Sequence, residues 1–118
     1  MEDFEIKIVD DVTVIGVNLT RATLNDAIAL RKIVEEEINS SNSNFVIDVS
    51  RCDFIDSTFF GAIVIAFKII KDKGYKLKVV EPANSGDNIF ITHNFRILFD
   101  LYKKGEDAIK SFENGTIT

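Results

Sequence analysis

The amino-acid sequence predicts an α/β fold, in which a mixed β-sheet opened by an N-terminal hairpin carries about four helices. Two alternating segments, Phe4–Asp10 and Val12–Leu19, flank the turn signal Asp10-Asp11 and are typical of a hairpin. The segment Phe45–Ser50 is short, β-branched and almost continuously apolar, as in a strand buried on both faces. After the hairpin, strand-like and helix-like segments alternate, which favours parallel strands joined by right-handed crossovers.

The chain is predicted to form one domain over residues 1–118. This length is near the commonest domain size, and the hydrophobic fraction of 46% and charged fraction of 28% are those of an ordinary globular protein. The sequence contains no internal repeat, low-complexity block or linker.

The first helix is expected to begin near Thr23, which can cap it, with Asp26 as the partner in a capping box. The polar segment Asn39–Asn44 ends this helix. Five apolar residues at helical spacing are expected to form one apolar face: Leu24, Ala27, Ile28, Val34 and Ile38.

The second helix is predicted from Thr58 to Lys73, with Gly74 as its C-cap. Four elements are predicted to follow: a strand at 75–82 ended by a proline, a shorter helix at 85–95, a short strand at 96–102 and an amphipathic helix at 105–113.

Charge and composition argue against several classes of partner. The net charge is −5 and no run of Lys or Arg forms a stripe, so direct nucleic-acid binding is not expected. The N-terminus lacks the basic and apolar regions of a signal peptide. The longest apolar run, Phe59–Phe67, falls well short of the ~20 residues that a membrane span needs. A cytoplasmic protein without membrane association is expected, and its oligomeric state is left open.

The sequence carries no motif for enzymatic chemistry. His93 is the only histidine and Cys52 the only cysteine, so zinc sites, catalytic triads and internal disulfides lack partners. Cys52 is expected to be a small core residue, with redox sensing as the alternative. Asp48, Asp53 and Asp56 crowd one region but are equally explained as caps and loop residues. We therefore expect no enzyme, no cofactor and no metal.

The triplet Asp56-Ser57-Thr58 stands directly before the apolar second helix and has two interpretations. One side chain can cap the helix by accepting a hydrogen bond from a backbone N–H, typically worth ~1 kcal/mol. Alternatively, a hydroxyl exposed at the helix start is a site for phosphorylation, because the free N–H groups and the helix dipole favour an anion there. The residues alone leave both interpretations open.

The second helix is apolar around most of its circumference. Burial between neighbouring elements is the favoured explanation, and a partner surface is the alternative. The exposed part is expected at the N-terminal turn, around Phe59 and Phe60.

The segment 45–82 resembles the signature of STAS domains, specifically of free-standing anti-sigma-factor antagonists. In that family a buried strand ends in Asp-x-Ser, and Asp-Ser-[Ser/Thr]-Gly-[aliphatic]-Gly opens a long helix. Asp48 and Ser50 match the strand end, the triplet at 56–58 matches the hydroxyl motif, and Gly61 matches the later glycine. Segments 12–30 and 98–112 are similar to other parts of the family's domain, so the resemblance covers essentially the whole chain.

The resemblance implies a STAS fold and a phosphorylation switch. The unphosphorylated protein would bind an anti-sigma factor that is also a serine kinase, and so release a sigma factor. The kinase would phosphorylate Ser57, with Thr58 as second choice, and a phosphatase would reverse the modification. Two further groups of residues are implied: partner contacts at Asp56, Ser57, Thr58, Phe59 and Phe60, and a supporting loop at Asp48 and Ser50.

Phe59 departs from the family pattern, because a glycine usually follows the hydroxyl pair. It is either an aromatic anchor for a particular partner or an obstacle to modification. In the second case the chain would be a STAS-type protein- or nucleotide-binding signalling module that phosphorylation does not regulate. A hydrolase with Ser57 as nucleophile is a third hypothesis, but the sequence offers it no base.

Overall fold

The computed structural model describes residues 2–83 and 99–114, and within them the main sheet has five strands in the order β1-β2-β4-β6-β7. The strands β1 and β2 are antiparallel, and the other neighbouring pairs are parallel. The mixed sheet opened by a hairpin is therefore confirmed. The strand bounds are β1 Phe4–Val9, β2 Val12–Val17, β4 Asn44–Asp48, β6 Leu77–Val80 and β7 Asp100–Tyr102.

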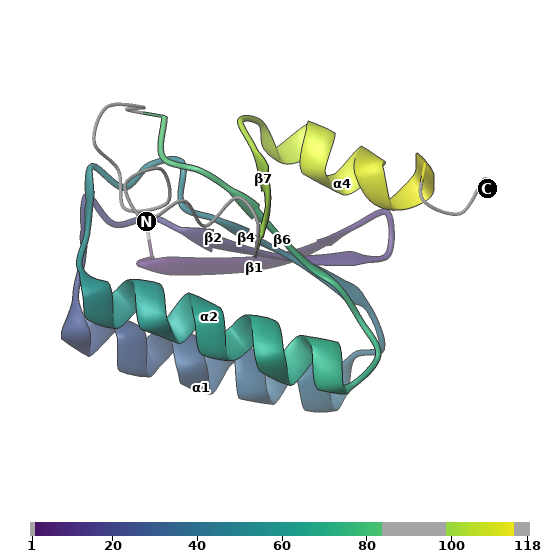
Figure 1. The fold of residues 1–118 in the computed structure, drawn as a ribbon, viewed down its shortest axis with the longest axis horizontal. Helices are drawn as coiled ribbons and strands as arrows, with labels where there is room; N and C mark the ends of the chain where they lie inside the picture. Colours follow the sequence, from purple (N-terminus) through teal and green to yellow (C-terminus); the bar gives the residue numbers. More distant parts are fainter. Residues whose placement is uncertain (1, 84–98, 115–118) are drawn as a thin grey trace.

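Helices cover both faces of the sheet (Figure 1). The helices α1 (Leu24–Ser40) and α2 (Ser57–Asp72) lie on one face and enclose the main core, whereas α4 (Gly105–Asn114) lies on the other face over a smaller apolar cluster. About four helices were expected, and the described ranges contain these three. The predicted helix at 85–95, with His93, lies outside the described residues.

The turn between β1 and β2 explains the register of the hairpin. Asp10 and Asp11 have φ values of 50° and 66°, in the left-handed region, and Val9 pairs with Val12 across them. Two consecutive positive φ values are typical of a type I′ turn, whose twist matches that of paired strands. The predicted turn is therefore confirmed.

Helix α1 begins as predicted but buries a different set of side chains. The Asp26 carboxylate accepts a hydrogen bond from the Thr23 backbone N–H over 2.9 Å, as in a capping box. Leu24 and Ile28, two of the five apolar residues at helical spacing, are 55% and 65% exposed and do not join the other three in the core. The reason is that α1 buries a narrow stripe on one side: Ala27, Leu30, Val34 and Ile38.

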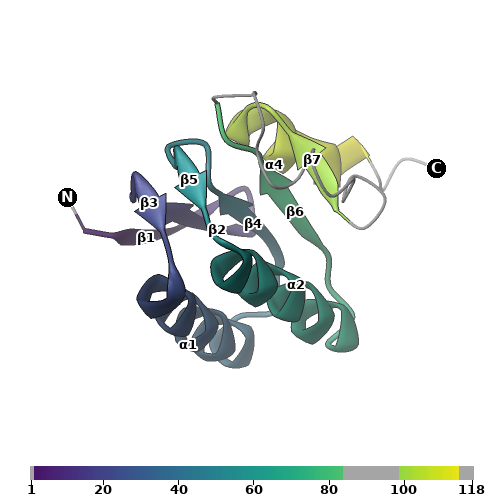
Figure 2. The same cartoon turned by 60° about the vertical axis from the view of Figure 1, so that its left-hand side comes forward.

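A small second sheet was not predicted. The strands β3 (Arg21–Ala22) and β5 (Phe54–Ile55) pair in parallel directly before α1 and α2. The backbone N–H of Asp56 then donates to the carbonyl of Ala22 over 3.1 Å. These bonds hold the starts of the two helices side by side, as Figure 2 shows.

Candidate functional site

Asp56 is the N-cap of helix α2. Its backbone is extended, with φ −80° and ψ 171°, and its Oδ1 accepts a hydrogen bond from the Phe59 N–H over 2.8 Å. Its carbonyl accepts the first helical bond, from the Phe60 N–H over 3.0 Å. Asp56 therefore caps the helix, and neither hydroxyl of the triplet is needed for this role.

Ser57 and Thr58 are the first two residues of α2, and both are exposed. Within the described part of the chain, neither hydroxyl has a hydrogen-bond partner. A free hydroxyl on a fixed helix start is accessible to an incoming phosphoryl donor. The cap and the candidate modification site are thus separate residues of the triplet.

Replacing Asp56 by Ala is expected to lower the free energy of unfolding by about 1 kcal/mol, because the Phe59 N–H loses its acceptor. Asp56→Asn keeps a cap oxygen and is expected to cost less. Urea denaturation of both variants measures the difference. Equal midpoints for Asp56→Ala and the unmodified sequence would contradict this assignment of the cap.

Backbone hydrogen bonds hold the loop before α2 in place. Asp48, at the end of β4, is half-buried, and its Oδ1 accepts from the Ser50 N–H over 2.9 Å. The Ser50 carbonyl accepts from the Ala83 N–H over 3.1 Å. Further along, the N–H groups of Asp53 and Phe54 both donate to the Thr20 carbonyl. Asp48 and Ser50 thus lie in a loop that is tied to two neighbouring segments, at Thr20 and at Ala83.

The expectation that Phe59 and Phe60 are exposed is wrong. Phe59 is completely buried and Phe60 is 5% exposed. The Phe60 ring makes an edge-to-face contact with Phe99, with the ring centroids 6.0 Å apart. The N-terminal turn of α2 exposes Ser57 and Thr58, so the next two residues point towards the sheet. Neither phenyl ring is available as a partner contact in this conformation.

Other apolar side chains are exposed near the start of α2. Phe54 is 43% exposed, and the Arg21 guanidinium lies 4.4 Å from the centroid of its ring. Ala22 pairs with Ile55, and α1 and α2 begin two residues later, so Leu24 and Ser57 take corresponding positions at the two helix starts. Phe54 was not among the predicted site residues, because it lies in the unpredicted β3–β5 pair, and Leu24 was expected only as part of the apolar face of the first helix.

Cys52 lies buried in the same loop, with 1% of its surface exposed. Burial, and after it the nearby Asp48 carboxylate, raise the pKa of its thiol to about 11. Asp26, on α1, and Asp53, in the loop, raise this pKa as well. Carboxylates from β4, the loop and α1 therefore all act on this thiol.

At pH 8, alkylation of Cys52 by iodoacetamide is expected to be about 100-fold slower in the folded chain than in urea. The thiolate is the reacting form, and a pKa of about 11 instead of 9.0 lowers its fraction by that factor. Mass spectrometry over a time course measures both rates. Similar rates in both states would show that the thiol is accessible and ionised.

The described residues offer neither a metal site nor a membrane-spanning helix. No group of three or more His, Cys, Asp or Glu side chains in 2–83 and 99–114 is arranged to hold a metal ion. Among the described helices, none combines the length and the apolar character of a membrane span.

Comparisons with known proteins assign the fold. No protein-family model and no curated protein matches the chain. A putative anti-sigma factor antagonist from Thermotoga maritima is 24% identical, with a TM-score of 0.77 and 92% of each chain covered. The anti-sigma factor antagonist SpoIIAA in its unphosphorylated form is 15% identical, with a TM-score of 0.71, covering 95% of this chain and 98% of its own. Its phosphorylated form, from Bacillus, matches with a TM-score of 0.70 and 13% identity, covering 92% of this chain and 98% of its own.

Proposed function

We propose that this chain, which has the STAS fold of these anti-sigma-factor antagonists, is itself such an antagonist. In its unphosphorylated form it binds an anti-sigma factor that is also a serine kinase, in the cytoplasm, and so releases a sigma factor. The kinase phosphorylates Ser57 and the complex dissociates, and a phosphatase restores the unmodified chain. The observation that supports this most is an exposed Ser57 hydroxyl, free of the capping role, at the family's motif position.

The surface around Ser57 supports binding of a protein partner. Phe54 and Leu24 are exposed large apolar residues at the same end of the molecule. A partner that covers them gains from burying apolar surface, and this is the main favourable term in most protein association. Arg21, stacked on Phe54, adds an aromatic–cation pair of the kind enriched at binding hot spots.

The charges near Ser57 explain why phosphorylation opposes binding. A phosphoserine adds roughly −1.5 to −2 charge, beside Asp56 and on a chain of net charge −5. A partner that covers the site must desolvate this dianion, and any acidic group of the partner repels it. The helix start still tolerates the phosphate within the folded chain, because N–H groups and the helix dipole favour an anion there.

The alternative, a signalling module that phosphorylation does not regulate, rested on Phe59 as a surface anchor or obstacle. Burial of this side chain removes that argument. Likewise, no described feature supplies a base for Ser57 as a hydrolytic nucleophile.

The experiment that tests the proposal uses the purified chain, a kinase-type anti-sigma factor from the same genome, and ATP. We expect a complex with the unmodified chain, a single phosphate mapped to Ser57 by mass spectrometry, and dissociation after phosphorylation. Ser57→Ala should bind but remain unmodified, and Thr58→Val is the matched control that keeps Ser57. The absence of any complex with the unmodified chain would refute the proposal, and phosphate on Thr58 would move the site.

A further inference from the structure

The outer edge of β1 presents backbone groups that are unpaired in the described part of the chain. β1 is a terminal strand of the sheet. The Asn18 N–H donates to the Asp3 carbonyl over 2.7 Å, and Val9 pairs with Val12 at the turn. Because hydrogen-bonded pairs alternate along an antiparallel ladder, the odd-numbered residues of β1 bond to β2. The N–H and C=O groups of the even-numbered residues (Phe4, Ile6 and Ile8) therefore point away from the sheet.

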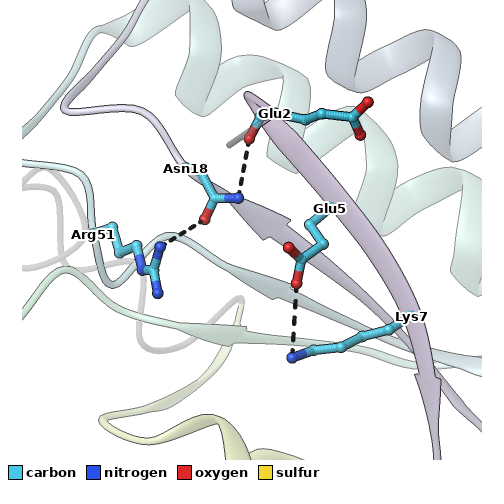
Figure 3. A network of polar contacts seen from close by, with 5 residues as sticks. All are labelled: Glu2, Glu5, Lys7, Asn18 and Arg51. Atoms are coloured by element: carbon cyan, nitrogen blue, oxygen red, sulfur yellow. Dashed lines mark hydrogen bonds and ion pairs between the residues drawn. The ribbon is translucent and has the colours of Figure 1, made fainter.

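The side chains of β1 form two different rows. Phe4 packs against the main core, and Ile6 and Ile8 continue its row with exposures of 41% and 64%. Glu5 and Lys7 project from the other face, are 59% and 61% exposed, and approach each other to 3.9 Å (Figure 3). An ion pair this exposed contributes little stability. The edge thus combines an exposed apolar row with two opposite charges.

We propose that β1 pairs antiparallel with β1 of a second copy of this chain, with Ile6 on the two-fold axis. In this register Ile6 lies opposite its own counterpart, and Phe4 lies opposite Ile8 of the second copy. Glu5 lies opposite Lys7 of the second copy. The two-fold symmetry forms both the Phe4–Ile8 pair and the Glu5–Lys7 pair twice. The outward backbone groups of the even-numbered residues bond to one another, and two five-stranded sheets become one continuous sheet.

Charge selects this register over its neighbours. Only the even-numbered residues of β1 have outward N–H and C=O groups, so they must lie opposite even-numbered residues of the second copy. The two nearest alternative registers therefore move the two-fold axis by one residue, to Glu5 or to Lys7. With the axis on Glu5, the two Glu5 carboxylates would face each other at the centre of the strand pair, and Lys7 would face only Asp3, which lies outside β1. With the axis on Lys7, the two ammonium groups would face each other. Like charges directly opposite each other destabilise a strand pair, whereas the proposed register pairs both charges favourably.

The expected dimer is weak. One six-residue edge strand buries less surface than a stable dimer requires, so we expect a dissociation constant of roughly 10–100 µM. Lysine on an edge strand often protects against such pairing. When the partner strand is another β1, Lys7 of each copy faces Glu5 of the other, and this opposite charge offsets the protection.

The test is sedimentation velocity over a concentration series, with charge reversals on β1. We expect the unmodified chain to dimerise, and Glu5→Lys or Lys7→Glu to weaken dimerisation at least about tenfold, because each places like charges opposite each other twice. The double variant Glu5→Lys/Lys7→Glu should restore it. The control Lys68→Glu makes the same charge change on the exposed face of α2 and should leave the dimer intact.

Each possible result of the sedimentation series supports or overturns the proposed β1–β1 dimer. A monomer at all concentrations up to about ten times the expected dissociation constant overturns the proposal. A dimer that survives either single reversal places the interface elsewhere, and failure of the double variant to recover overturns the register. Circular dichroism checks that the variants fold, as expected for residues this exposed. The test needs no anti-sigma factor, so its outcome is separate from that of the proposed function.

Discussion

Ser57→Asp is expected to lower the affinity for the proposed anti-sigma-factor partner at least about tenfold, which corresponds to 1.4 kcal/mol. The new carboxylate stands in the surface that a partner covers, beside the cap carboxylate of Asp56. It must lose its hydration on binding. Isothermal titration calorimetry with the kinase-type anti-sigma factor measures the change.

The matched control is Ser57→Asn, which has the shape of Asp without its charge. We expect it to bind within a factor of a few of the unmodified chain. Stability should not fall in Ser57→Asp, because Ser57 is exposed and a carboxylate in the first turn of a helix interacts favourably with the dipole. Equal affinity of the Asp and Asn variants would show that charge at this position does not control binding.

Phe59→Ala is expected to lower the free energy of unfolding by about 3–5 kcal/mol. The Phe59 side chain is completely buried in the main core between α2 and the sheet, so its loss leaves a cavity that rigid neighbours fill only partly. Urea denaturation followed by circular dichroism measures the change. A midpoint equal to that of the unmodified chain would contradict the burial of this side chain.

Phe54→Ala is the matched control, since the same ring is removed from an exposed position five residues earlier. We expect a loss of at most about 1 kcal/mol, because only the contact with Arg21 and part of the ring's burial disappear. Phe54→Ala should weaken partner binding more than Phe59→Ala does, the reverse of their effects on stability. Phe54→Ala weakens it directly, whereas Phe59→Ala affects it only through the fraction of folded chain.

The sequence predicted the main-sheet strands and the described helices, but not the β3–β5 pair, because the signals of the former are local. Alternation marks the hairpin, a continuous apolar run marks β4, and Gly74 at φ +90° ends α2 as a C-cap glycine does. The predicted second helix and the observed one differ by a single residue at each end. These patterns depend on neighbours within a few positions, so one sequence is enough to find them.

The site could be predicted only in part, because exposure at a helix start depends on tertiary geometry. The triplet at 56–58 lies at the start of α2 as expected, but which member caps the helix depends on the backbone conformation of Asp56. The burial of Phe59 depends on how α2 is rotated against the sheet. An aromatic residue in a position usually held by glycine suggested a surface role, and only the packing of the core excludes it.

The turn at Asp10-Asp11 has a consequence for the order in which the chain folds. Residues paired between β1 and β2 are at most 13 positions apart, whereas β2–β4 and β4–β6 partners are 32 apart. Closing the shorter loop costs less chain entropy, so the hairpin is expected to form before the parallel strands assemble. The free edge of β1 then exists while the rest of the chain is still collapsing. Refolding at high concentration should therefore favour contact between chains through this edge, before the helices have docked.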